Sequence, residues 1–315
     1  MLDFIEVAQG LRFPEGPIAC ADGTLLVVEI QGGSLTRIYP DGRKEVVAEL
    51  GGGPNGAAIG PDGRCYVCNN GGLGFRQIKG CTMPMLASES YSGGWIDVVD
   101  LESGEVNVLF RNCGDIGLSA PNDIVFDQYG GFWFTDSGKM HRNHRDRGGI
   151  FYALPDGSLI KRVVFPLEGA NGIGLSPDGR ILYATEAHAG RLWAYEIVGP
   201  GEIRRGNGPI PWEHGDLLGI SDTYSIYDSL AVDHDGNICV ADIPLGGITV
   251  FSPDGRLIEK HPMPDVFPTN ICFGGDGLQT AYITLSSTGR IIAMPWPRGG
   301  LSLHWLLPTF TTSHT

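Results

Sequence analysis

The chain has 315 residues, a net charge of −14 and 42% hydrophobic residues, so it can bury a large core but has no basic surface for nucleic acid or an anionic membrane. Its 48 glycines stand in turns between short apolar runs, which is typical of β-hairpins and not of low-complexity sequence. The seven cysteines are scattered and odd in number, so we expect reduced thiols and no disulfide framework; Cys65 and Cys68 would point to opposite faces of a strand.

The N-terminal residues show neither a basic segment nor the apolar segment of a secretory leader. No apolar run approaches the roughly 18 residues that a membrane-spanning helix needs. These features predict a cytoplasmic protein without a membrane partner.

The first predicted element is a strand over residues 4–8, where apolar and polar side chains alternate. A hairpin over residues 15–29 follows, with its turn at Asp22-Gly23, and a second hairpin over residues 34–48 turns at Asp41-Gly42. Together the two hairpins make a unit of four short antiparallel strands.

The first hairpin returns five more times along the chain. A polar residue opens each of the six copies, namely Glu15, Asn55, Asn122, Asn171, Asp228 and Asn270. The apolar run after each turn ends on Glu29, Asn69, Asp136, Glu186, Asp242 and Thr284. The spacing from opener to end is 14 residues in five copies and 15 in the fourth.

The second hairpin recurs as well. We expect its strands to pair over residues 95–99 with 106–110, 150–154 with 159–164, 191–197 with 202–205, 248–251 with 257–260, and 290–295 with 301–305. Six four-stranded units predict an all-β fold, a six-bladed β-propeller formed as a single domain over residues 1–315. A closed ring needs its first and last blades joined, so we expect residues 4–8 to pair with the last blade as an outer strand.

Strand direction places all six openers on one face, where each innermost strand begins beside the central channel. The connections that leave the second and fourth strands of each blade lie on that same face. Four long insertions fall among them, at residues 70–94, 112–121, 137–149 and 211–227. Long loops over a polar centre on a rigid scaffold indicate a binding site.

Four openers, Glu15, Asn122, Asn171 and Asp228, would direct oxygen atoms toward one axis. Carboxylate and amide oxygens suit Ca²⁺, Mg²⁺ or Mn²⁺, and Zn²⁺ also accepts carboxylates. Two carboxylates about 4 Å apart repel by about 4 kcal/mol at an effective dielectric near 20, which a divalent cation would offset. The alternative is that such residues only form turns, as Asn55-Gly56 would by itself. We expect Asn55 and Asn270 to line the channel or support the ligands, and the strand-end residues to accept hydrogen bonds behind them.

Four segments around these openers resemble the SMP-30/gluconolactonase/LRE-like family: Phe13-Pro14-Glu15-Gly16-Pro17, Pro121-Asn122-Asp123-Ile124, Ala170-Asn171-Gly172-Ile173 and Tyr227-Asp228-Ser229-Leu230. The resemblance implies a six-bladed propeller that holds a divalent metal, Ca²⁺ in first place, and hydrolyses lactones. It implies ligand roles for Glu15, Asn171 and Asp228, and it places Asn122 at the metal or against the substrate. We expect Asp228 also to orient or deprotonate the attacking water, and Asn55 and His188 to contact the lactone or ester substrate.

One position departs from the resemblance. Animal members of the family place an arginine two residues before the asparagine of the third blade, where it holds sugar hydroxyls, and this chain has Ala120 there. Apolar residues such as Leu73, Phe75 and Met85 in the insertions further favour a substrate less polar than a sugar lactone. His141 and His144 stand in an arginine-containing loop that would either contact an acidic substrate or be solvated.

Two other functions remain open from the sequence. The related diisopropyl-fluorophosphatase uses a similar Glu-Asn-Asn-Asp set on phosphoesters, so a phosphotriesterase is one alternative. The other is a non-catalytic propeller that binds a partner through a broad apolar face. A serine hydrolase is disfavoured because no G-x-S-x-G segment is present.

Overall fold

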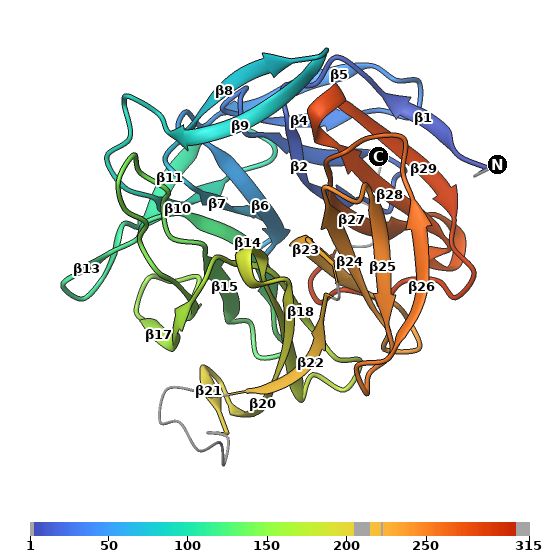
Figure 1. Ribbon diagram of the computed structural model, residues 1–315. Helices are drawn as coiled ribbons and strands as arrows, with labels where there is room; N and C mark the ends of the chain where they lie inside the picture. Colours follow the sequence, from blue (N-terminus) through green and yellow to red (C-terminus); the bar gives the residue numbers. More distant parts are fainter. Residues whose placement is uncertain (1–2, 205–214, 222, 307–315) are drawn as a thin grey trace, which may run out of the picture.

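Six antiparallel sheets of the computed structural model stand around a common axis as the blades of a β-propeller (Figure 1). The structure describes residues 3–204, 215–221 and 223–306. Its helical segments are three 3-10 turns, η1 (Ala187–Ala189), η2 (Asp276–Leu278) and η3 (Ser286–Thr288). No helix within the described ranges is long and apolar enough to cross a membrane. The predicted all-β, six-bladed fold is confirmed.

In each blade, four strands follow in order from the channel to the rim. The first blade contains β2 (Pro14–Ala19), β3 (Leu25–Glu29), β4 (Ser34–Ile38) and β5 (Lys44–Glu49). The second contains β6 (Pro54–Ile59), β7 (Cys65–Asn69), β10 (Trp95–Val99) and β11 (Val106–Phe110). The third contains β14 (Pro121–Phe126), β15 (Phe132–Asp136), β16 (Gly148–Ala153) and β17 (Ile160–Leu167). The fourth blade contains β18 (Ala170–Leu175), β19 (Ile181–Glu186), β20 (Arg191–Gly199) and β22 (Asp216–Ile220). The fifth contains β23 (Ile226–Val232), β24 (Ile238–Ile243), β25 (Gly247–Phe251) and β26 (Leu257–Pro262). The sixth contains β27 (Pro268–Gly274), β28 (Thr280–Leu285), β29 (Arg290–Pro295) and β1 (Ile5–Ala8).

The core is divided among the contacts between neighbouring blades. Among the described residues, six clusters of buried side chains form, one at each of the six blade-to-blade contacts. In β7, Tyr66 and Cys68 pack toward the third blade, while Cys65 and Val67 pack toward the first. Because both faces of β7 are covered, its sequence is apolar at every position except the last. All seven cysteines are free, as the sequence predicted.

The ring is closed by the N-terminal strand, as expected. β1 pairs antiparallel with β29, with Ile5 opposite Ala293 and Glu6 opposite Ile292 (Figure 1). The prediction that residues 301–305 pair with β29 was wrong, because β1 already occupies that edge. Residues 301–306 instead cross other blades, where Leu301 N donates to Val232 O and Trp305 Nε1 donates to Asp127 O.

The outer strand of the fourth blade was also misplaced. We expected residues 202–205 there, but β21 (Glu202–Ile203) pairs only with the end of β20, and β22 forms the edge along residues 191–194. Residue 205 lies outside the described residues, as do residues 211–214 and 222 of the predicted 211–227 insertion. The 211–227 segment, predicted to be a loop, therefore contains an edge strand.

Two of the four insertions cover the channel opening. Residues 73–87 form the hairpin β8 (Leu73–Ile78) and β9 (Cys81–Ala87), and β9 reaches η3 of the sixth blade. Residues of this hairpin and of the 137–149 loop line one cavity with the openers. The 112–121 insertion behaves differently, because its hairpin of β12 (Asn112–Cys113) and β13 (Ile116–Gly117) lies against β17.

Glycines beside the openers let the inner strands approach closely. A Cβ on Gly16 would lie 2.6 Å from Asn55 O, and the backbone there has a φ of +52°. Gly114 has a similar φ of +60° but open space around it. We expect Gly16→Ala to lower the free energy of unfolding by roughly 3 kcal/mol or more, and Gly114→Ala by about 1–2 kcal/mol, since only the first adds a clash to the strain.

Urea unfolding of both variants tests this difference. Equal losses in the two variants would mean that the close approach of the inner strands contributes nothing to stability.

Candidate active site

All six openers lie at the second or third position of an innermost strand. Each of these strands shifts its register against its neighbour close to the opener, as between Glu15 and Ile18 in β2 and, just before the opener, between Pro268 and Asn270 in β27. A β-bulge redirects side chains and commonly lies beside functional sites. The repeated bulge therefore explains how residues of ordinary strands come to face the channel.

The openers converge on a single cavity of about 440 Å³. Five of the six line it, namely Glu15, Asn55, Asn122, Asn171 and Asp228. The sixth, Asn270, donates from Nδ2 to Glu15 Oε2 at 2.8 Å, and Gly16 N donates to the same oxygen at 2.7 Å. The structure thus brings the sequence-predicted residues together and gives Asn270 a supporting contact.

Three carboxyl groups at the centre influence one another. Burial raises the pKa of Glu15 to about 7, partly offset by the hydrogen bonds from Asn270 and Gly16. Burial and the neighbouring Glu15 charge raise the pKa of Asp228 well above its ordinary range and that of Asp123 to about 8. Without a cation, these groups therefore resist ionisation together.

Two buried oxygens in the cavity have no hydrogen-bond partner. They are Asn122 Oδ1 and Asn171 Oδ1, each on a residue less than 10% exposed. A buried amide oxygen without a partner carries a desolvation penalty of about 1–3 kcal/mol. Together with the Glu15 and Asp228 carboxylates, they form a set of hard oxygen donors from four blades, which fits a divalent cation such as Ca²⁺.

The strand-end carboxylates hold the loops behind this set, as the sequence predicted. Asp136 accepts hydrogen bonds from the backbone N–H groups of Ser119, Ala120 and Gly138 at 2.7–2.9 Å. Glu29 and Glu186 accept similar bonds from Arg12 N and Glu168 N. These bonds fix the segments that lead into the inner strands, and so fix the openers.

Comparison with known proteins identifies the family of this chain. The sequence model of the SMP-30/gluconolactonase/LRE-like region matches residues 13–287. The chain belongs to this family. The match contains the openers Glu15, Asn55, Asn122, Asn171, Asp228 and Asn270.

Among its relatives, the lactonase Drp35 of Staphylococcus saprophyticus is 30% identical over 81% of this chain and 71% of its own length. The gluconolactonase of Zymomonas mobilis is 26% identical over 89% of this chain and 78% of its own length. The solved structure of a gluconolactonase from Xanthomonas campestris superposes with a TM-score of 0.72 at 21% identity, covering 93% of this chain and 89% of the other. That last likeness shows the fold.

The walls of the cavity that contains the openers are mostly apolar. Its apolar lining comes from both the blades and the insertions and includes Phe13, Ile30, Leu73, Met85, Met140, Ile226 and Phe267. Ala120 also lines it, at the position where animal family members are expected to have arginine.

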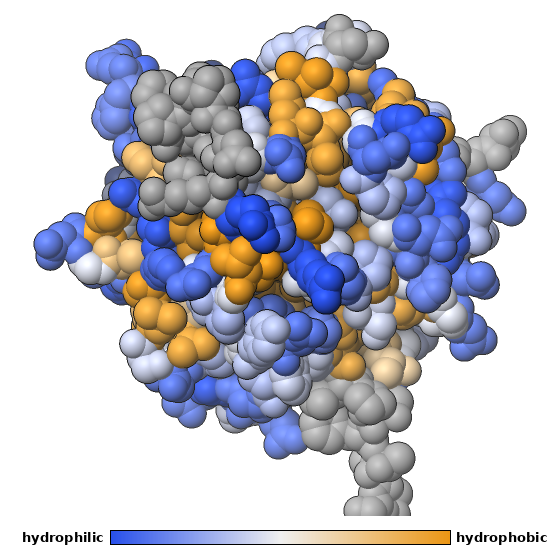
Figure 2. Space-filling model, turned by 90° about the horizontal axis from the view of Figure 1, so that it is seen from below, coloured by the Kyte–Doolittle hydropathy of each residue, from blue (hydrophilic) through white to orange (hydrophobic). Residues whose placement is uncertain are grey.

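On the face of the molecule shown in Figure 2, hydrophobic residues form small groups separated by hydrophilic ones.

Two polar residues of the centre were not identified from the sequence. Asp123 occupies the place that glycine takes after Asn55 and Asn171, which was the available signal; its Oδ2 accepts from Ile173 N at 3.2 Å. Lys139 is 1% exposed, lines the cavity, and donates from Nζ to Asn70 O at 2.6 Å. Nothing in the local sequence separates Lys139 from an ordinary loop lysine.

The predicted His188 lies at the cavity beside Arg145. Partial desolvation and the Arg145 charge lower the pKa of His188 to about 4, so the ring is neutral at physiological pH. His188 is thus placed to act as a neutral hydrogen-bonding group.

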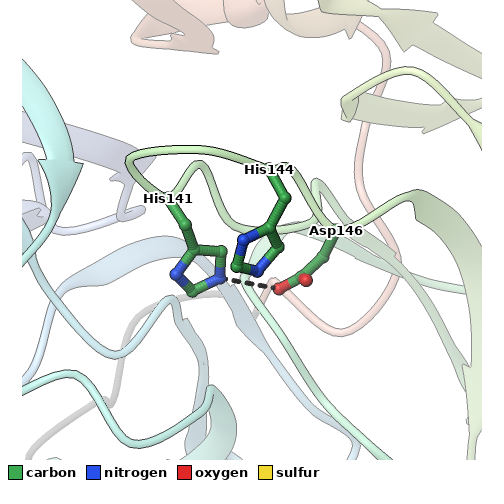
Figure 3. A group of neighbouring side chains, drawn as sticks. All are labelled: His141, His144 and Asp146. Atoms are coloured by element: carbon green, nitrogen blue, oxygen red, sulfur yellow. Dashed lines mark hydrogen bonds and ion pairs between the residues drawn. The ribbon is translucent and has the colours of Figure 1, made fainter.

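A separate group of possible metal ligands lies in the 137–149 loop. The ligand atoms of His141, His144 and Asp146 all lie within 4.8 Å of one another, and the two rings stack at 4.3 Å (Figure 3). Asp146 Oδ2 already accepts Ser119 Oγ at 2.5 Å and contacts His141 Nε2 at 3.2 Å. These contacts tie the loop to the segment before β14.

Proposed function

We propose that this chain is a divalent-metal-dependent hydrolase that opens the ring of a lactone. The unpartnered oxygens of Asn122 and Asn171 beside the Glu15 and Asp228 carboxylates carry the proposal, because a cation explains all four at once. Membership of the family and the lactonase and gluconolactonase names of its relatives support the same reaction.

In this proposal Glu15, Asn122, Asn171 and Asp228 hold the metal, with Ca²⁺ as the expected ion. The ion would polarise the lactone carbonyl and lower the pKa of water beside it. Asn122, together with Asn55 and His188, would position the substrate in the cavity.

Asp228 would act as the general base. It is more exposed than the buried Glu15, and the bound cation would keep its carboxylate ionised and able to take up a proton. It would accept a proton from the attacking water as the water oxygen bonds to the carbonyl carbon. The ring C–O bond then breaks, and the proton passes to the leaving oxygen to give a hydroxy acid. The apolar walls exclude other water.

Metal removal tests the proposal. The protein is stripped with chelator, reloaded with Ca²⁺, Mg²⁺, Mn²⁺ or Zn²⁺ singly, and assayed on sugar, aliphatic and aromatic lactones beside a fluorophosphonate. We expect no lactone hydrolysis after stripping and recovery with one ion, Ca²⁺ first. Turnover of the fluorophosphonate alone would identify a phosphotriesterase. Full activity in the stripped protein, or no turnover with any ion, would reject the metal-dependent hydrolase.

A further inference from the structure

The cavity contains two basic side chains that form no ion pair with a carboxylate among the described residues. Arg145 lines it with a buried Nε that has no hydrogen-bond partner, and its one hydrogen bond to a described residue is long, from an Nη atom to Ser137 O at 3.5 Å. Lys139 lines it with Nζ bonded only to the oxygens of Asn70, at 2.6 and 3.2 Å. Among the described residues, neither side chain has an ion-pair partner within 4.0 Å.

The acidic groups nearest to these cations are already engaged. Glu168 pairs with Arg147 at 3.5 Å and not with Arg145. Asp136 accepts three backbone N–H groups, and Asp146 accepts Ser119 Oγ. The two cations are therefore not parts of a protein ion-pair network.

Burying unpaired charge is costly, and burial lowers the pKa of Lys139 to about 7 and also lowers the pKa of Arg145. Such unpaired groups in a cavity mark functional sites more often than structural ones. Asp136 and Asp146 attract Lys139, and Glu168 attracts Arg145, only from beyond ion-pair distance. The carboxylates of Glu15 and Asp228 would be neutralised by the proposed metal, so no carboxylate pairs with either cation.

We infer that the substrate is a lactone that carries a carboxylate, which Arg145 and Lys139 bind while the ring lies against the apolar wall. This inference rests on the proposed function. The planar guanidinium suits a carboxylate because its parallel N–H groups match the two oxygens, and Lys139 adds a point charge. A neutral sugar lactone would leave both cations unpaired.

A matched pair of probes tests the inference. The substrates are γ-butyrolactone bearing a carboxylate on the carbon next to the ring oxygen, and the same lactone bearing a primary carboxamide. In the metal-loaded wild type we expect kcat/KM to favour the carboxylate by at least about tenfold, mainly through KM. Arg145→Gln should lower that ratio at least about tenfold, and Lys139→Met should lower it in the same direction.

Arg147→Gln is the control, because it removes the same charge from the same loop but its side chain is 59% exposed and pairs with Glu168 outside the cavity. It should leave the ratio unchanged. A wild-type ratio near one, or an equal loss of the ratio in Arg145→Gln and Arg147→Gln, would overturn the inference.

Calorimetric binding separates the inference from the proposed function. The ligands are the same two compounds with the ring oxygen replaced by methylene, which cannot be hydrolysed as lactones. Tighter binding of the carboxylate in the wild type, lost in Arg145→Gln, would support the inference even if no lactone is turned over. Turnover of both lactones without any preference would support the hydrolase and reject the inference.

Discussion

Replacing Asp228 with asparagine is expected to reduce lactone hydrolysis by about a thousandfold while leaving the propeller folded. The substitution keeps the size of the side chain and removes the proton acceptor, and general-base catalysis typically supplies between a hundredfold and ten-thousandfold of rate. It also removes one of the three neighbouring carboxyl groups that resist ionisation without a cation, so the metal-free variant should be at least as stable as the wild type.

Asp97→Asn is a matched control for this variant. Asp97 is also a buried carboxylate, with burial raising its pKa to about 6, but it lies in β10 and accepts hydrogen bonds from Asn69 and Trp95 away from the cavity. We expect it to keep kcat within a few-fold. Lactone hydrolysis at more than a tenth of the wild-type rate in folded, metal-loaded Asp228→Asn would contradict the role of Asp228 as base.

The second large effect concerns stability without metal. The pKa of Glu15 is about 7 in the folded protein against 4.5 for the ordinary group. Below pH 4.5 both states hold the proton and Glu15 contributes no penalty. Between pH 4.5 and 7 only the unfolded state releases it, so the metal-free protein loses stability as pH rises, by an amount on the order of 3 kcal/mol, and stays less stable above pH 7.

Thermal unfolding of chelator-treated protein across this pH range measures the effect. Glu15→Gln should show a shallower fall than the wild type, because glutamine does not titrate. Adding Ca²⁺ should raise the Tm of the wild type most at pH 8, where both ligand carboxylates are needed in ionised form, and should raise that of Glu15→Gln much less. Identical pH dependence in the two metal-free proteins would show that burial does not raise the pKa of Glu15.

The repeated hairpin made the architecture predictable. The repeat can be seen in the local sequence without knowing which strands meet across the ring. The positions of the openers, the turns and the closing strand could therefore be predicted from the spacing alone. The errors arose where two segments compete for one edge. Residues 301–305 and the N-terminal strand both suited the edge of β29, and the pairing of β22 with β20 bridges a long insertion. Local pattern does not decide such competitions.

The candidate site was predictable to the same extent. The openers share a position in the repeat, so their convergence followed from the ring. Asp123 and Lys139 have no such pattern. Lys139 becomes part of the cavity because its loop folds back over Asn70, 69 residues earlier in the chain, and that contact exists only in three dimensions. Arg145 likewise has no ion-pair partner because Glu168 pairs with Arg147, and this contact also exists only in three dimensions.

The join between the first and last blades has a consequence for biosynthesis. Asn270 reaches Glu15 across 255 positions of the chain, and β1 completes the blade that contains Asn270. A nascent chain that has not yet emerged past the sixth blade lacks both the bond that orients Glu15 and the partner for its first strand. A nascent chain that ends before the sixth blade therefore contains the four proposed donors but lacks the contact that holds Glu15 among them.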